Sequence, residues 1–461
     1  MKNMKNIFSM TLLLAAAISF TACQGEEADL FDKSAAERLN AVADAYTAVL
    51  AEPASGWIME YYPTNSNSNP TGLGYLMAVD FQEDGFVKVG MLNSLTGGAY
   101  EENLSVWEVI TDNGPVLSFS TYNDILHYFS DPAIYDQGNG LSGDYEFVMV
   151  DVPEDHQTIM LKGKKRGTYV RLTRLPDGTD FETYLKDVYD FQNRIFSASA
   201  PNYDYVTLDG KVYTFDEPST TLPNIYLKGY DAIANEYRLP FILAKKGDNY
   251  FVRFRTTLKF EEEGNDDIKG EQEFTYDPAK DIFVGVDNEA NQISGSDPTE
   301  FMADVLDSHR SWGFNYGAEM SESVSALFTA LYQDMYNNFR GTTFKRISIT
   351  EVTSGEENKV QVGVVYRGVN NKGKPNSTDS RAAYNYNVVR NADHSLTLTY
   401  DAPANDASAT LYNNLPTLQA LLNALSKTIA AKPYESAFNL TSIIISDAND
   451  ANFWFKANYN S

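Results

Sequence analysis

The sequence predicts an α+β fold, predominantly antiparallel β meanders with a few packed amphipathic helices, in two domains. Two observations carry this prediction. Short segments of alternating apolar and polar residues recur along most of the chain, and turns rich in Gly, Asn and Asp separate them, as in antiparallel sheets. A few longer segments repeat apolar residues every three or four positions, which is typical of helices packed by one face. The length is enough for two or three domains.

The first domain, residues 34–196, is predicted to begin with a helix. Ser34 and Glu37 match the S-x-x-E pattern of a capping box. Apolar residues at helical spacing continue from there to about Glu52, and Pro53 and the nearby glycine end the helix.

The rest of the first domain is predicted as an antiparallel meander, open or curled toward a barrel. Its apolar pattern has a period of two residues, and the Asp84–Gly85 pair indicates a hairpin. Strands are predicted at 57–62, 75–81, 86–91, 104–110, 116–120, 145–150, 158–161 and 168–172. A helix over about 180–196 closes the domain, and 197–202 is the linker candidate.

The second domain, residues 197–461, repeats the mixture of hairpins and helices. Helices are predicted at about 298–308, 322–340 and 415–431. Strands are predicted at 203–208, 211–215, 226–230, 241–245, 250–259, 343–351, 359–366, 382–390, 396–400, 440–445 and 453–456.

The composition is that of an acidic, folded protein. The chain has 36 Lys and Arg against 63 Asp and Glu, a net charge of −27, which argues against nucleic acid as a partner. Its 30 Tyr, 26 Phe and 4 Trp are more aromatic residues than a disordered chain would have.

The N-terminus predicts a lipoprotein signal peptide over residues 1–22. Two lysines precede an apolar run, and small residues lead to Cys23, the only cysteine. A lipoprotein signal predicts that Cys23 is acylated and anchors the chain in a lipid bilayer. The alternative is an ordinary secretory signal with an incidental cysteine. Residues 23–33 are predicted to form an acidic tether. Acidic residues after Cys23 resemble the surface-export signal of Bacteroidetes lipoproteins, which predicts an outer-membrane protein exposed on the cell surface, with a periplasm-facing protein as the alternative.

Sequence motifs give little support for catalysis. The four histidines are scattered, no H-E-x-x-H or G-x-S-x-G occurs, and the G-x-x-x-x-G-K match at 368–374 is followed by Pro375 where a hydroxyl is needed. No catalytic residue, cofactor or metal site is therefore predicted. A carboxylate pair for glycoside hydrolysis stays open, because it needs proximity in space only. The basic segment 162–167 is interpreted as a hairpin tip, or else a site for an acidic partner.

An aromatic cluster is the best candidate for ligand binding. Trp312, Phe314 and Tyr316 alternate in a glycine-rich segment that is predicted to be a loop between two helices. Such rings can form a platform against the face of a sugar. The alternative is that these rings fix the loop to the core.

Three short segments carry a family resemblance: Ser34–Leu39, Gly56–Trp57 with Tyr61–Pro63, and Gly143–Phe147 with the 162–167 turn. With them the chain resembles a Bacteroidetes surface-lipoprotein family of unknown function (DUF4302-like), often encoded near SusC/SusD-type uptake systems. The resemblance implies a surface lipoprotein and supplies no catalytic residue. The preferred hypothesis is a non-enzymatic binding accessory to glycan or nutrient uptake. The alternatives are a structural or assembly subunit of an outer-membrane complex and, third, a carboxylate-dependent hydrolase.

Overall fold

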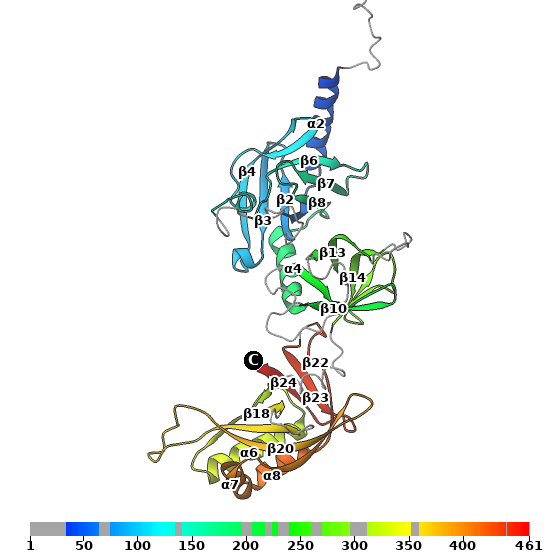
Figure 1. The fold of residues 1–461 in the computed structure, drawn as a ribbon. Helices are drawn as coiled ribbons and strands as arrows, with labels where there is room; N and C mark the ends of the chain where they lie inside the picture. Colours follow the sequence, from blue (N-terminus) through cyan, green and yellow to red (C-terminus); the bar gives the residue numbers. More distant parts are fainter. Residues whose placement is uncertain are drawn as a thin grey trace, which may run out of the picture.

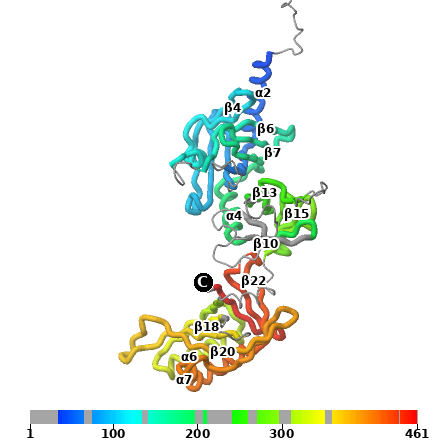
Figure 2. Tube along the Cα trace, viewed as in Figure 1, coloured from blue at the N-terminus to red at the C-terminus, as the bar shows by residue number. Residues whose placement is uncertain are grey.

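The structure, a computed structural model, forms three closed antiparallel barrels of eight strands each. The barrels follow one another along the chain and in space (Figure 1), and the Cα trace runs through them in order (Figure 2). The structure describes residues 34–63, 74–133, 141–195, 205–216, 224–228, 239–259, 270–295, 311–351, 359–438 and 440–460.

The first barrel closes by pairing of its first and last strands. Its elements are α2 (Ala35–Ala51), β1 (Trp57–Tyr62), β2 (Tyr75–Phe81), β3 (Phe86–Met91), β4 (Glu101–Thr111), β5 (Pro115–Phe119), α3 (Asp124–Tyr128), β6 (Glu146–Asp151), β7 (Thr158–Gly163) and β8 (Tyr169–Arg174). The helix α4 (Phe181–Ile195) follows.

The predicted capping box at the start of α2 is confirmed. The Ser34 hydroxyl accepts a hydrogen bond from the Glu37 backbone N–H at 3.3 Å, and the Glu37 carboxylate accepts one from the Ser34 N–H at 2.9 Å. At the other end, the Trp57 indole N–H donates to the Leu50 carbonyl at 2.8 Å. Gly56 makes this turn with φ +65, and a Cβ on it would lie 2.4 Å from the Val79 carbonyl oxygen, so only glycine fits.

The second barrel has shorter strands. They are β9 (Tyr205–Leu208), β10 (Lys211–Asp216), β11 (Asn224–Lys228), β12 (Leu239–Lys246), β13 (Asn249–Leu258), β14 (Glu271–Asp277), β15 (Ile282–Gly285) and β16 (Gln292–Ser294), with β16 paired to β9. The helix α4 packs between this barrel and the first, in contact with β12 on one side and with β2 and β3 on the other. The Tyr184 hydroxyl donates to the Lys245 carbonyl at 2.7 Å, and Phe191 stacks on Tyr250 with ring centroids 3.8 Å apart.

The third barrel packs three helices onto its core and closes through β17 and β24. Its elements are β17 (Ser311–Asn315), α6 (Glu322–Asn338), β18 (Thr343–Glu351), β19 (Lys359–Arg367), β20 (Ser380–Arg390), β21 (Leu396–Pro403), α7 (Asp406–Asn414), α8 (Pro416–Ala424), β22 (Thr428–Pro433), β23 (Ser442–Asp447) and β24 (Trp454–Asn460).

A loop of the third barrel joins it to the second. Between β22 and β23, Phe438 enters the core of the second barrel, where it is 1 % exposed and its ring lies 5.6 Å from that of Phe283. The carboxylate of Asp281 accepts hydrogen bonds from the Ala437 N–H at 2.7 Å and the Ser436 hydroxyl at 2.9 Å. The loop is thus fixed by both apolar and polar contacts.

The predicted fold class, α+β with mostly antiparallel strands, is confirmed. The span 197–461, predicted as one domain, contains two separately closed barrels. The predicted helix over 415–431 is wrong after Ala424, because β22 begins at Thr428. The predicted helix at 298–308 and the linker at 197–202 lie outside the described residues.

Candidate functional site

A cleft of about 930 Å³ lies between the outer faces of the first and second barrels. Strands β1, β7 and β8 form one wall, and β12, β13 and β14 form the other. We call it the interbarrel cleft. Its charged lining residues are five cations, Arg171, Arg174, Lys245, Lys246 and Arg253, and three acids, Glu60, Asp177 and Glu273. The cleft is therefore richer in cations than the chain as a whole.

Strand alternation explains why these side chains face the cleft. On β1 the side chains of Trp57, Met59 and Tyr61 belong to the core of the first barrel. Successive side chains on a strand point to opposite faces, so Glu60 points outward. Glu60 pairs in register with Arg171 on β8, so the two lie side by side on the outer face.

Arg253 connects the two walls of the cleft. It lies on β13, and its guanidinium donates from Nε to the Glu273 carboxylate at 2.8 Å and from Nη1 to the Glu60 carboxylate. Burial raises the pKa of Glu60, while Arg253 and then Arg171 oppose that change. The same guanidinium thus compensates one carboxylate from each barrel.

This arrangement limits what the two carboxylates can do. A hydrolytic pair must flank the bond that is cleaved. Glu60 has only 2 % of its side chain exposed, and both Glu60 and Glu273 are bound to Arg253. The geometry therefore favours an electrostatic connection between the barrels over an acid–base pair.

A second group of charges lies at the rim of the cleft. Glu52 accepts from Arg174 at 2.9 Å and is 3.0 Å from Nδ1 of His156, and these hydrogen bonds lower the pKa of Glu52. On the opposite wall Lys245 forms an ion pair with Asp187 on α4. These pairs fix the positions of the rim cations Arg174 and Lys245.

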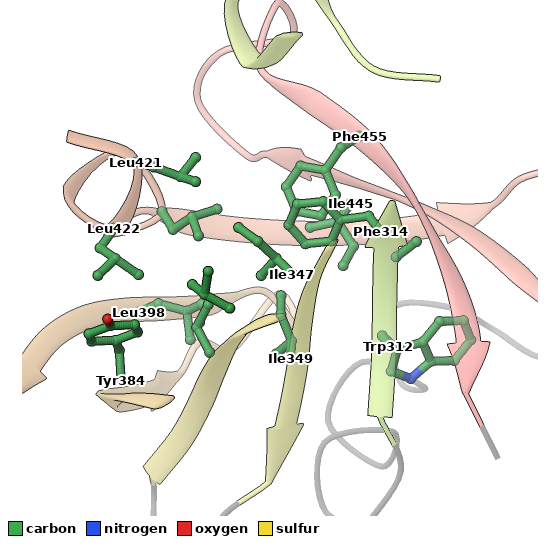
Figure 3. Packing of buried hydrophobic residues seen from close by; sticks show 14 of the residues in the cluster. Trp312, Phe314, Ile347, Ile349, Tyr384, Leu398, Leu421, Leu422, Ile445 and Phe455 are labelled. Atoms are coloured by element: carbon green, nitrogen blue, oxygen red, sulfur yellow. The ribbon is translucent and has the colours of Figure 1, made fainter. Parts of the chain in front are cut away.

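The predicted aromatic platform is corrected by the structure. Trp312 and Phe314 point into the third barrel, where they are 1 % and 0 % exposed (Figure 3). They lie on β17, because the segment is a strand whose alternate residues face the core. Tyr316 is half-buried and stacks on Tyr332 with centroids 4.7 Å apart. Only Tyr316 of the three reaches the surface.

The other segments that the sequence singled out have structural roles or lie outside the described residues. The basic 162–167 segment is a hairpin tip between β7 and β8, as interpreted. The 368–375 segment joins β19 and β20 and does not open a helix. Cys23 lies outside the described residues. Within the part that is described, no group of three or more His, Cys, Asp or Glu could hold a metal ion, and no helix is long and apolar enough to cross a bilayer.

Comparison with known proteins identifies the family. Residues 27–270 match the model of a family described as a domain of unknown function (DUF4302). The chain belongs to this DUF4302 family. The matched region covers the first barrel and both β12 and β13 of the second, so it includes most of the interbarrel cleft. The match confirms the DUF4302 resemblance that the sequence predicts.

The remaining comparisons add no functional information. No curated protein matches the chain. Among solved structures, the DNA polymerase III subunit beta from Pseudomonas aeruginosa is 9 % identical, with 90 % of this chain and 96 % of that chain covered. Its TM-score of 0.12 is too low to support an argument about fold or function.

Sequence reasoning did not identify the cleft residues. One signal was present: Glu60 stands among apolar residues in a buried strand, and Arg253 and Arg255 alternate with apolar residues in another. A charged residue inside such a strand indicates either a partner on another element or a ligand. The sequence alone does not say which.

Proposed function

We propose that this DUF4302 protein is an outer-membrane lipoprotein anchored through acylated Cys23, exposed on the cell surface, and that it binds a glycan or other nutrient in the interbarrel cleft. It would act as a non-enzymatic accessory to uptake, beside SusC/SusD-type membrane proteins. The observation that carries the binding role is the cleft itself. Its volume of about 930 Å³ lies within the range of roughly 300–1,000 Å³ typical of small-molecule sites.

Two further observations support this location. The interior of the first barrel is filled by buried side chains such as Trp57, Tyr61 and Phe147, which leaves no evident room for a ligand there. Ligand sites also occur preferentially at domain interfaces, where side chains from two units converge. In the cleft, polar side chains for recognition come from both barrels, including Thr158 and Thr275.

Binding is tested with the chain from residue 24 onward, screened on polysaccharide affinity gels and by isothermal titration calorimetry. Thr158→Trp fills the cleft from the first barrel. Thr399→Trp places the same bulk on the exposed outer side of β21, in the third barrel. We expect Thr158→Trp to abolish binding and Thr399→Trp to retain it. A blank across broad polysaccharide panels, with the protein folded, would reject the binding role.

The anchor is tested separately in cells. Incorporation of labelled palmitate should require Cys23 and should disappear in Cys23→Ala. Protease treatment of intact cells should remove the chain if it faces outward, whereas protection until the outer membrane is opened would place it in the periplasm. Secretion of an unmodified chain would remove the lipoprotein assignment.

A carboxylate-dependent hydrolase, the third hypothesis from the sequence, is tested at the same cleft, because Glu60 and Glu273 both line it. Glu273→Gln separates the two candidates. Loss of saccharide cleavage with retained binding would support the hydrolase. Absence of cleavage products from the unaltered protein, for a glycan that it binds, would remove this candidate.

A further inference from the structure

The interbarrel cleft contains an arginine with an unused hydrogen-bond donor. Arg171 lines the cleft from β8, and its Nε is buried with no hydrogen-bond partner. No ion pair joins its guanidinium to any residue that the structure describes. Thr173, two positions further on the same face of the strand, also lines the cleft and has a buried hydroxyl without a partner.

The missing partner is not explained by a shortage of acids. The chain has 63 Asp and Glu for 36 Lys and Arg. Glu60 stands opposite Arg171 in the β1–β8 register, yet its carboxylate is bound by Arg253. Arg253 also binds Glu273, and the third acid of the cleft, Asp177, is exposed. One arginine thus binds Glu60 and Glu273, and Arg171 forms no ion pair of its own with the residues that the structure describes.

A buried donor without an acceptor is energetically unfavourable. It destabilises the folded state, and a charged donor does so more strongly. Arg255, two residues after Arg253 on β13, is a second example near the cleft: its Nη1 is buried without a partner, and its guanidinium lies 5.8 Å from the Tyr169 ring centroid. Burial lowers the pKa of Arg255 accordingly.

We infer that the ligand of the interbarrel cleft carries an oxyanion group, a carboxylate or a sulfate ester, which binds at the Arg171 guanidinium and the neighbouring Thr173. This inference rests on the proposed function and specifies it: the ligand is an acidic oligosaccharide. An arginine fork and a hydroxyl are the donors that such groups prefer. Alternate side chains on one strand face are roughly 7 Å apart, close enough for both to reach one oxyanion group.

The acidic surface of the protein does not oppose this assignment. Exposed charges are screened beyond about 8 Å at physiological ionic strength, so distant acids act weakly inside the cleft. Within the cleft, cations outnumber acids by five to three. Lys246, exposed on the rim, can meet a second acidic unit of the same oligosaccharide.

The test compares matched ligands that differ only in charge. Oligogalacturonide and its methyl ester form the carboxylate arm, and sulfated and unsulfated dextran oligosaccharides form the sulfate arm. Calorimetry on the mature protein should show at least about 10-fold tighter binding of the charged member of one pair, because a hydrogen bond to a charged group is worth that much. The arm that shows the preference identifies the oxyanion.

Two variants locate the preference. Arg171→Met keeps the apolar stem without the charge, and Thr173→Val removes the hydroxyl at similar volume. We expect Arg171→Met to bind both members of the pair equally and Thr173→Val to reduce the preference. Lys372→Met, in the exposed hairpin of the third barrel, removes one positive charge elsewhere and should leave the preference unchanged. If Arg171→Met fails to fold, Thr173→Val alone tests whether the preference for the charged ligand depends on this site.

The possible results separate this inference from the proposed function. If the protein binds neutral and acidic oligosaccharides equally, and Thr158→Trp blocks both, the cleft binds a ligand but the oxyanion assignment is wrong. If Arg171→Met keeps the full preference, the anion binds elsewhere. If no saccharide binds, the proposed function and the oxyanion assignment are both wrong.

Discussion

Glu60 of the first barrel and Arg253 of the second form an ion pair that is buried between the two barrels, although 193 residues separate them in the chain. The side chains are only 2 % and 10 % exposed, so neither charge is solvated by bulk water. A buried ion pair contributes little net stability, but its loss leaves one charge uncompensated. The pair therefore fixes how the first two barrels sit against each other.

Removal of Arg253 should destabilise the protein strongly. Arg253→Met leaves Glu60 and Glu273 without their shared cation, so we expect the free energy of unfolding to fall by about 3–5 kcal/mol in urea denaturation. The double variant Glu60→Leu with Arg253→Met should recover most of this loss. Lys186→Ala, which breaks an exposed pair with Asp190, should change stability by less than about 0.5 kcal/mol. Equal effects of the buried and exposed variants would contradict the structural role.

Asp144 connects two segments that carry the family resemblance. Its carboxylate accepts hydrogen bonds from the backbone N–H groups of Lys165 at 3.1 Å and Arg166 at 2.9 Å, and from the Thr168 hydroxyl at 2.9 Å. Asp144→Ala leaves these donors unpaired, so we expect a loss of about 3 kcal/mol in denaturant unfolding. Asp112→Ala, which ends an exposed ion pair with Lys164, is the control and should have little effect.

Phe438 should couple the second and third barrels. Phe438→Ala would leave a cavity in the core of the second barrel and cost about 3–5 kcal/mol. Hydrogen exchange should accelerate in β15 and β16, which lie around this ring, before it changes in the first barrel. Phe86→Ala removes the same group from the surface of the first barrel, where it is exposed, and should leave exchange in the second barrel unaltered.

The partly buried His127 should make the stability of the protein depend on pH. Burial lowers the pKa of His127 from 6.5, and its Nδ1 accepts a hydrogen bond from the Asn123 N–H at 3.1 Å. The unfolded chain therefore binds a proton here at a pH where the folded chain does not, so stability falls as pH decreases below about 6.5. An NMR titration should give His127 a pKa below 6.5. His127→Gln should reduce the loss of melting temperature between about pH 7.5 and about pH 5.5; an unchanged loss would contradict this origin.

Most strands of the first barrel could be predicted because one face lies in the core and the other outside, although β1 is buried throughout. That asymmetry gives the period-two pattern, and all eight strands were placed within a few residues of their observed bounds. The same signal fails in the second barrel, where β15 and β16 have only four and three residues. The period-two pattern does not distinguish an open sheet from a closed barrel, because closure depends on the pairing of strands far apart in the chain.

The helix predicted over 415–431 shows how local spacing can mislead. Leu421, Leu425 and Ile429 recur at helical intervals, but α8 ends at Ala424. Ile429 is buried by the sheet through β22, which pairs with β23. Tertiary pairing decided between two structures that the apolar pattern allows equally.

The candidate site was beyond single-sequence reasoning for a related reason. Trp312 and Phe314 are residue types that often form a binding platform. On β17, however, alternate side chains face the core, and both residues point inward. The cleft residues Glu60, Arg171 and Arg253 come from strands in two barrels. Their proximity depends on how those barrels pack, and no local pattern encodes it.

Closure of the three barrels also constrains how another protein can recognise this chain. Every strand of the described sheets has a hydrogen-bonded neighbour on both sides. Exposed sheet edges are where a foreign peptide adds as an extra strand, and where unwanted association begins. In the part of the chain that the structure describes, closure leaves little unpaired strand edge, so we expect partners to contact mainly side chains and connecting loops. Many copies at high concentration need not exchange strands.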